Sequence, residues 1–192
     1  MKKTWTIIIA ILAVILIWGV STYNKFIKAQ ENMTNAWGQV ENVYQRRADL
    51  IPNLVAVVKE YSEFEQGTLI AVTEARAKAS ATTLTANDMT EEQLQSFEGI
   101  QDELTNTLGR LTARVEDYPD LKANEQYLTL QAQLKGCENR ILTERQRYNE
   151  LVQEYNKQVR KFPSSIIATM FGFEKRPYFE ATTENADQAP RI

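Results

Sequence analysis

The N-terminal segment decides how this chain is built, because residues 5–20 read WTIIIAILAVILIWGV. Only Thr6 and Gly19 interrupt the apolar run, and the charge-free stretch from Thr4 to Asn24 is 21 residues long. At about 1.5 Å per residue, a helix of this length covers the roughly 30 Å hydrocarbon core of a bilayer. The sequence therefore predicts a transmembrane anchor over residues 1–24 that meets lipid through residues 5–23. The side chains expected to face lipid and headgroups are Trp5, Ile7, Leu12, Leu16, Trp18 and Tyr23.

A cleaved signal peptide is the alternative interpretation, since Lys2 and Lys3 followed by an apolar run begin both kinds of segment. Cleavage requires small residues in an A-x-A-like pattern, which residues 19–21 match poorly. Two lysines precede the run and two others, Lys25 and Lys28, follow it. The positive-inside rule therefore gives almost no preference for either orientation. Because a short basic tail before a long apolar run is typical of a signal-anchor, we expect the C-terminal domain to lie outside the cytoplasm.

The composition of the 192 residues excludes several function classes. There are 0 His and 1 Cys, so histidine acid–base catalysis, histidine metal ligation and an intrachain disulfide are all ruled out. The 22 Lys+Arg and 25 Asp+Glu give a net charge of −3, which does not indicate a nucleic-acid binder. Acidic neighbours such as Glu91 and Glu92 cannot share a helix face. We therefore expect no enzyme activity, no cofactor, no metal site and no nucleic-acid partner.

The remainder of the chain carries the pattern of amphipathic helices, with apolar residues at steps of three and four. Four such stripes follow the anchor: Phe26, Ala29, Met33, Ala36, Trp37, Val40, Val43 and Tyr44; Leu54, Val57, Val58, Tyr61, Phe64, Leu69, Val72 and Ala75; Leu94, Phe97, Ile100, Leu104, Leu108, Leu111 and Val115; and Tyr127, Leu130, Leu134, Cys137, Ile141, Tyr148, Leu151, Tyr155, Val159 and Phe162. The predicted fold is all-α: a transmembrane helix and then an antiparallel, up-down-up-down four-helix bundle over residues 25–162.

The helix boundaries come from prolines and caps. The predicted helices cover residues 21–50, 52–80, 90–117 and 122–162. Pro52 fits the first turn of a helix, so we place the first reversal there; the alternative is that it only kinks one long helix. Thr90, followed three residues later by Gln93, has the form of a capping box. Pro119 and Pro163 mark the ends of the third and fourth helices.

The short apolar segment at residues 163–180 follows the bundle. In an up-down-up-down bundle the fourth helix returns the chain to the bilayer, and this segment is too short to span it. We therefore expect an interfacial segment in which Ile166, Ile167, Met170, Phe171 and Phe173 contact the membrane. The alternative is that these side chains plug the end of the bundle. The polar tail at residues 181–192 is expected to be disordered.

Polar residues on the apolar stripes indicate a buried ion pair. The first stripe continues from Tyr44 to Arg47, and the fourth continues from Ile141 to Glu144. Because a buried charge needs a partner, we predict an interhelical pair between Arg46 or Arg47 and Glu144, joined by Asn149. The role expected for this pair is structural. A buried ligand site and ordinary exposed charges are the alternatives.

Several ordered strings resemble the LemA family. They are YQRRADLIPNLV at residues 44–55, EARA at 74–77, YPDLKAN at 118–124, ENRI at 138–141, ERQRYNE at 144–150, FGF at 171–173 and PYF at 177–179. The resemblance runs from the anchor to about residue 181. It implies a bacterial, membrane-anchored helical-bundle protein of the inner membrane, and it implies no reaction, since this family has no established enzymatic activity.

These features together favour an interaction or scaffold module at the cell envelope. A bundle held at a membrane concentrates its binding surface in two dimensions. The expected partners are the lipid bilayer and an unidentified protein, with self-association into a homo-oligomer as a further expectation. A ligand-sensing or regulatory subunit of a membrane complex is the alternative, with the polar core residues as its site.

Overall fold

The computed structural model describes residues 2–61, 65–86 and 89–180. Helix fills most of these residues and they contain no strand, so the predicted all-α class is confirmed. The helices are α1 (Lys2–Lys59), α2 (Gln66–Ala81), α3 (Glu91–Val115), α4 (Pro119–Lys122), α5 (Glu125–Arg160) and α6 (Ser164–Phe171). Two predictions, the place of Phe64 on the second stripe and the disorder of residues 181–192, fall outside the described residues.

Pro52 lies inside α1 and does not reverse the chain, which corrects the predicted turn at this residue. A proline at position 52 has no N–H to donate to the carbonyl of Ala48, four residues earlier. Arg76 of α2 supplies the missing donor, with its Nε 2.8 Å from the Ala48 carbonyl oxygen. α1 therefore passes through the proline, and the first reversal falls between Lys59 and Gln66.

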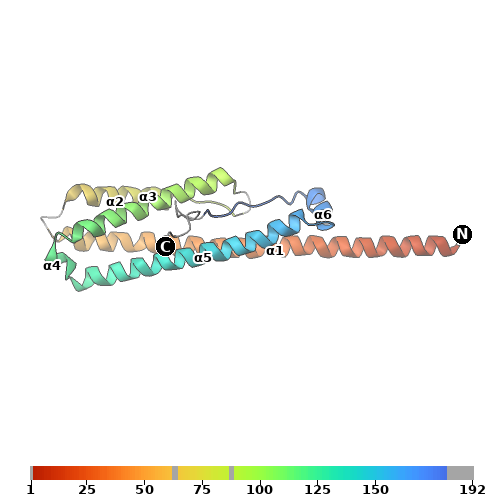
Figure 1. Ribbon diagram of the computed structural model, residues 1–192, viewed down its shortest axis with the longest axis horizontal. Helices are drawn as coiled ribbons and strands as arrows, with labels where there is room; N and C mark the ends of the chain where they lie inside the picture. The colour runs from red at the N-terminus through yellow and green to blue at the C-terminus, as the bar shows by residue number, and fades with distance from the viewer. Residues whose placement is uncertain (1, 62–64, 87–88, 181–192) are drawn as a thin grey trace, which may run out of the picture.

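The helices form two antiparallel pairs. α1 packs along α5, with Trp37 against Tyr148, and α2 packs along α3, with Lys78 paired to Glu103. α2 also packs against α1, which joins the two pairs. The predicted first two helices, at residues 21–50 and 52–80, are of similar length, whereas α1 has 58 residues and α2 only 16. The N-terminal part of α1 consequently extends alone beyond the other helices (Figure 1).

Side-chain caps begin two of the long helices, and the cap of α3 is the one predicted from the sequence. Thr90 accepts a hydrogen bond from the Gln93 backbone N–H, and the Gln93 side chain accepts one from the Thr90 N–H, which is the predicted capping box. At the start of α5, the Asn124 side chain accepts hydrogen bonds from the N–H groups of Gln126 and Tyr127. These caps fix where the chain turns back into each long helix.

Two hydrophobic cores are stacked along the molecule. The aromatic core, nearer the protruding end of α1, is built on Phe26, Trp37, Tyr148, Tyr155, Phe173 and Phe179. The aliphatic core, nearer α4, is built on Ile51, Leu54, Val58, Val72, Leu104, Leu111 and Leu121. Both cores are formed by residues on the predicted stripes together with residues that sequence periodicity did not place.

Candidate functional site

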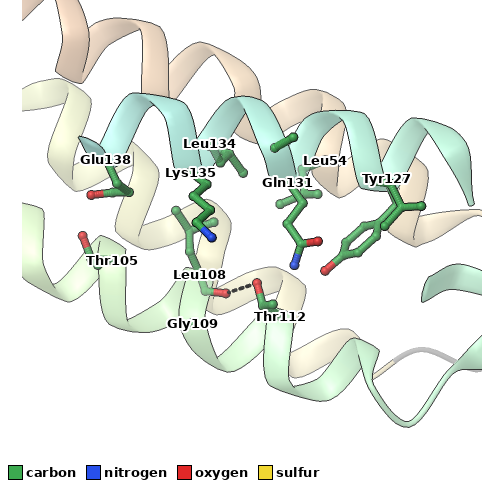
Figure 2. A pocket seen from close by; sticks show the side chains of 12 residues that line it. Leu54, Thr105, Leu108, Gly109, Thr112, Tyr127, Gln131, Leu134, Lys135 and Glu138 are labelled. Carbon is green, nitrogen blue, oxygen red and sulfur yellow. Dashed lines mark hydrogen bonds between the residues drawn. The ribbon is translucent and has the colours of Figure 1, made fainter. Parts of the chain in front are cut away.

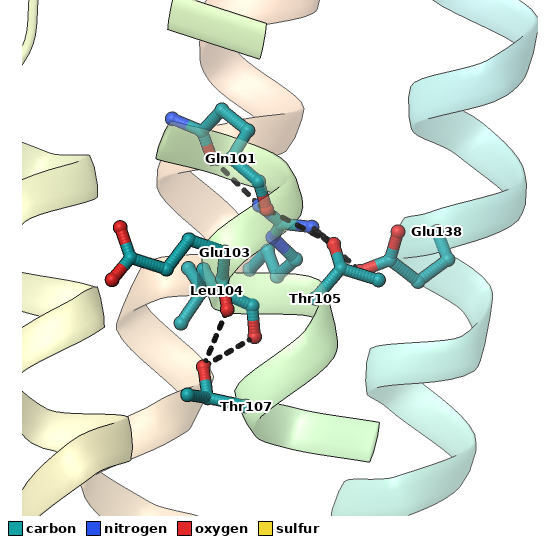
Figure 3. A network of polar contacts seen from close by, with 7 residues as sticks. Gln101, Glu103, Leu104, Thr105, Thr107 and Glu138 are labelled. Carbon is teal, nitrogen blue, oxygen red and sulfur yellow. Dashed lines mark hydrogen bonds and ion pairs between the residues drawn. The ribbon is translucent and has the colours of Figure 1, made fainter. Parts of the chain in front are cut away.

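Arg47 lies in a buried polar layer between the two cores. Its side chain is 1% exposed, and it follows Tyr44 of the aromatic core and precedes Ile51 of the aliphatic core on the same face of α1. Its Nη1 donates to Thr105 Oγ1 at 2.8 Å and to Glu138 Oε1 at 2.7 Å. Its Nη2 donates to Gln101 Oε1 at 2.6 Å. Figure 3 shows these three partners converging from α3 and α5. The guanidinium thus ties α1 to both helices.

The predicted carboxylate partner is wrong, because Arg47 pairs with Glu138 and not with Glu144. The register of α1 and α5 that places Trp37 against Tyr148 also places Arg47 against Glu138. Glu144 lies six positions further along α5, which is about 9 Å at 1.5 Å per residue. The stripes alone fixed which side chains face inward, but not the axial offset of the two helices.

The other residues predicted for this pair lie outside the Arg47 layer. Arg46 is exposed and points away from the polar layer. Glu144 lies 3.9 Å from Arg147 on its own helix. Asn149 is half-buried and binds the backbone of Phe179. Arg47 is therefore the one predicted member that is buried and forms an ion pair with another helix.

A second buried ion pair, which sequence reasoning missed, joins Arg145 of α5 to Glu98 of α3. Burial raises the pKa of the Glu98 carboxyl, and the opposing charge of Arg145 lowers it by a smaller amount. Arg145 Nη2 also donates to the Glu180 carbonyl at 3.0 Å, and its guanidinium lies 4.6 Å from the centre of the Phe179 ring. The signal was present: Arg145 follows Ile141 by four residues and precedes Tyr148 by three, so it lies on the fourth stripe.

The extended chain at residues 173–180, which we call the strap, runs back along α5. Two asparagines hold it through the same pair of bonds. The Asn149 amide donates to the Phe179 carbonyl and accepts from the Phe179 N–H, both at 2.9 Å. The Asn156 amide does the same with Arg176, again at 2.9 Å for both bonds. Each amide thus imitates the pairing of a neighbouring β-strand.

The spacing of these contacts follows from geometry. Seven residues of helix, from 149 to 156, rise about 10.5 Å. Three residues of extended chain, from 176 to 179, span about 10 Å. The two contacts are therefore in register on an antiparallel strap.

The strap places two rings in the aromatic core. The Phe179 ring stacks on Trp37 with centroids 5.6 Å apart, and the Phe173 ring stacks on Phe26 at 4.7 Å. Both phenylalanines are buried. Phe173 therefore does not face a membrane, which corrects its predicted role. Ile167 is also buried, so it belongs to the inner side of α6.

The protruding end of α1 carries the predicted anchor. Trp5, Ile7, Leu12, Leu16 and Trp18 are all exposed, while Tyr23 is half-buried against Phe171. Among the described residues one helix, α1, is long and apolar enough to cross a membrane, and none of its most apolar window is buried. α6 packs beside this end of α1, with Ile166, Met170 and Phe171 exposed.

A cleft of about 520 Å³ opens between α3 and α5 (Figure 2). It is lined by apolar side chains such as Leu54, Leu108 and Leu134, with Gln131 and Lys135 beside them. It also shares two residues, Thr105 and Glu138, with the Arg47 layer. Over the part of the chain that the structure describes, no three acidic or cysteine side chains gather into a potential metal site.

Comparison with known proteins gives a consistent assignment. The LemA family model matches residues 36–192. Magnetosome protein MamQ 2 of Paramagnetospirillum magneticum is 28% identical over an alignment of 175 residues that covers 82% of this chain and 64% of that protein. MamQ of Magnetospirillum gryphiswaldense is 27% identical with the same coverage. Protein LemA of Metamycoplasma hominis is 23% identical over 159 residues, 83% of this chain and 69% of that protein.

The chain thus spans 64% of the length of each of these MamQ proteins. The matched region begins within α1 and includes the Arg47 layer, the Glu98–Arg145 pair and the strap. From the family match and the curated relatives, this chain is a member of the LemA family.

Proposed function

We propose that this protein is a single-pass membrane protein whose helical bundle acts as a non-enzymatic interaction module at the bacterial cell envelope. The observation that carries the proposal is the continuity of α1, which runs as one helix from the exposed apolar segment into both cores. A bundle built on the same helix as its anchor is held at a fixed height above the bilayer. Partners that share the membrane then meet it at a raised effective concentration.

The proposal treats α1, α2, α3 and α5 as one antiparallel four-helix bundle. The support is the two antiparallel pairs and the Arg47 layer, which links α1, α3 and α5 through charge-assisted hydrogen bonds. The outer faces carry exposed apolar side chains, Ile70 on α2 and Leu142 on α5, that a partner protein can contact.

The experiment that tests this function is photo-crosslinking in intact cells. A photoreactive amino acid replaces Ile70 or Leu142, which are 53% and 58% exposed. The same substitutions are made in a variant whose residues 1–24 are exchanged for a cleaved signal peptide. We expect crosslinks to a defined protein from the anchored form and a severalfold loss from the released form. Equal crosslinking of the two forms would contradict the proposal.

We further propose that the bundle lies outside the cytoplasm of the cell (inner) membrane. The support is the signal-anchor pattern of residues 2–20. A C-terminal tag on the full chain is expected to be digested when protease is added to intact spheroplasts. A tag that is digested only after lysis would place the bundle in the cytoplasm.

A regulatory, ligand-sensing role is the second candidate, and the α3–α5 cleft is the observation that favours it. Gly109 lines this cleft, and a Cβ at that position meets nothing within 4 Å. Gly109→Phe should therefore place a side chain in the cleft, whereas Gly99→Phe, outside the lining, serves as a matched control, and circular dichroism checks that both variants keep their helices. Native mass spectrometry should reveal a copurified small molecule that only Gly109→Phe removes. If the wild-type protein and both variants carry the same bound mass, or if none of them carries one, this role is excluded.

A further inference from the structure

The short helix α6 lies beside the end of the apolar span of α1 (Figure 1). A Cβ built on Gly19 would lie 3.7 Å from Ile167 Cδ1, so the Ile167 side chain packs over this glycine. One turn further, the Tyr23 ring lies 4.8 Å from the Phe171 ring. Residues 19 and 23 both belong to the charge-free stretch that ends at Asn24. α6 is therefore docked onto the last turns of the span.

The outer side of α6 is apolar and unusually exposed. Phe162 is 76% exposed and Met170 is 69% exposed, and Ile166 and Phe171 are about half exposed. The inner side is formed by Ile167 and Ala168, which are buried. Four large apolar side chains grouped beside an apolar span form the kind of patch that marks a contact with a membrane or a protein.

We propose that α6 and Phe162 form a second membrane contact, inserted in the headgroup layer of the same leaflet from which α1 emerges. This proposal rests on the function proposed above, because α6 reaches lipid only if α1 spans the bilayer. The depth agrees with an interfacial helix. From Gly19 to Asn24 the helix rises about 7.5 Å, and interfacial helices bury their apolar face by about 5–10 Å.

The charges around α6 support lipid rather than a protein as the occupant. Lys25 and Lys28 of α1, together with Lys161 and Lys175 next to α6, are all exposed at this end of the molecule. Glu174 is the acidic neighbour within the same segment. Exposed lysines close in sequence to an apolar patch match a bilayer that contains anionic headgroups, to which such residues are attracted. The patch is also continuous with the apolar surface of α1.

Two anchoring points would have a geometric consequence. A single helix leaves the bundle free to tilt toward any of its sides. A second contact through α6 fixes which side of the bundle faces the lipid. The exposed residues on α2 and α5 would then be presented at a defined orientation to partners in the same membrane.

The test measures depth with spin labels on the full chain. Met170→Cys and Phe162→Cys are each made in a Cys137→Ala background and labelled in nanodiscs of phosphatidylcholine and phosphatidylglycerol. Gln153→Cys on the exposed side of α5 is the aqueous control, and Leu12→Cys in the span is the lipid control. Collision with oxygen, which dissolves in lipid, is compared with collision with a water-soluble nickel chelate.

We expect the ratio of oxygen to nickel collisions at positions 162 and 170 to exceed the ratio at position 153 severalfold and to fall below that at position 12. A ratio at 162 and 170 equal to that at 153, with position 12 in lipid, would overturn the α6 proposal and leave the anchor intact. Shielding of 162 and 170 from both reagents would also overturn it, because a second copy would then cover the patch. An aqueous ratio at position 12 would instead refute the proposed anchor.

Discussion

At the scale of the residue, the bundle is organised by charges that lie inside it. Arg47 is buried between two apolar cores, yet its guanidinium meets Glu138, Gln101 and Thr105. A buried charge is tolerated when hydrogen bonds satisfy it. Removal of the arginine leaves its partners without their charged donor, and removal of a partner leaves part of the guanidinium unpaired. This layer therefore specifies how α1, α3 and α5 align along the bundle axis.

Arg47→Met should lower the free energy of unfolding by about 1–3 kcal/mol, since the buried Gln101 side chain loses its charged donor. The loss should stay below the roughly 3–5 kcal/mol of a fully buried pair, because the Glu138 side chain is 37% exposed. Denaturant unfolding followed by circular dichroism measures the change. Arg46→Met, at the exposed neighbour, is the control and should change stability by less than about 0.5 kcal/mol. Equal effects of the two substitutions would contradict the Arg47 layer.

The Glu98–Arg145 pair predicts a pH dependence. Burial raises the pKa of Glu98 above its usual 4.5. At a pH just above 4.5, the unfolded chain has therefore released the proton of this carboxyl while the folded protein still keeps it. Glu98 therefore favours folding at low pH, and this contribution declines as the pH rises from about 4.5.

Glu98→Gln removes the titration but keeps an oxygen for Arg145. The stability of the wild-type protein minus that of Glu98→Gln should thus fall between pH 4 and neutrality, as measured by urea unfolding at a series of pH values. A difference that instead grows with pH would mean that the charge of Arg145 outweighs burial.

At the scale of the element, α1 and the strap each depend on side chains that replace missing backbone partners. Arg76 donates to the Ala48 carbonyl that Pro52 leaves without an N–H donor. Asn149 and Asn156 pair with the backbone of an extended strap that has no neighbouring strand. In both cases a polar side chain from another element completes a backbone hydrogen bond, as buried backbone groups require.

A double-mutant cycle tests the Pro52 account. Pro52→Ala restores an N–H donor inside α1 and should raise stability by up to about 3 kcal/mol, the usual cost of an interior proline. Arg76→Met should cost about 1–2 kcal/mol with proline at position 52 and clearly less with alanine there. Thermal or chemical unfolding of the four proteins gives the coupling energy. Additive effects would show that Arg76 does not compensate for the proline.

Loss of one asparagine should loosen the strap. Asn156→Ala removes both bonds to Arg176 and should cost about 1–3 kcal/mol. Hydrogen exchange of the peptide covering residues 173–180 should accelerate, while exchange in α2 should not change. Gln153→Ala, at an exposed position on α5 between the two asparagines, is the matched control. An unchanged exchange rate in Asn156→Ala would mean that ring packing alone holds the strap.

At the scale of the whole molecule, sequence periodicity predicted the composition of the cores better than their connections. Val40, Leu54, Leu104, Leu111 and Tyr155 lie on the predicted stripes and are fully buried. The place of the first reversal could not be read locally. Pro52 is compatible with both a first turn and a helix interior, and a residue of another helix, Arg76, supports the interior.

The strap was the least predictable part of the fold. Residues 173–180 have neither helical nor alternating periodicity, and their position depends on Asn149, Asn156 and the ring of Trp37. These partners lie 20 or more residues away in the sequence. The candidate ion pair failed for a related reason: inward-facing positions are encoded locally, whereas the offset between α1 and α5 depends on the lengths of all the helices.

The central claim is that one rigid helix carries the bundle from the bilayer to its far core. The most direct test is a pulsed electron–electron distance between spin labels at Leu12→Cys and Arg46→Cys, in a Cys137→Ala background in nanodiscs, diluted with unlabelled protein. Thirty-four residues of continuous helix predict a narrow distribution near about 51 Å. A broad or much shorter distribution, or a missing coupling because residue 12 has been cleaved away, would contradict the account.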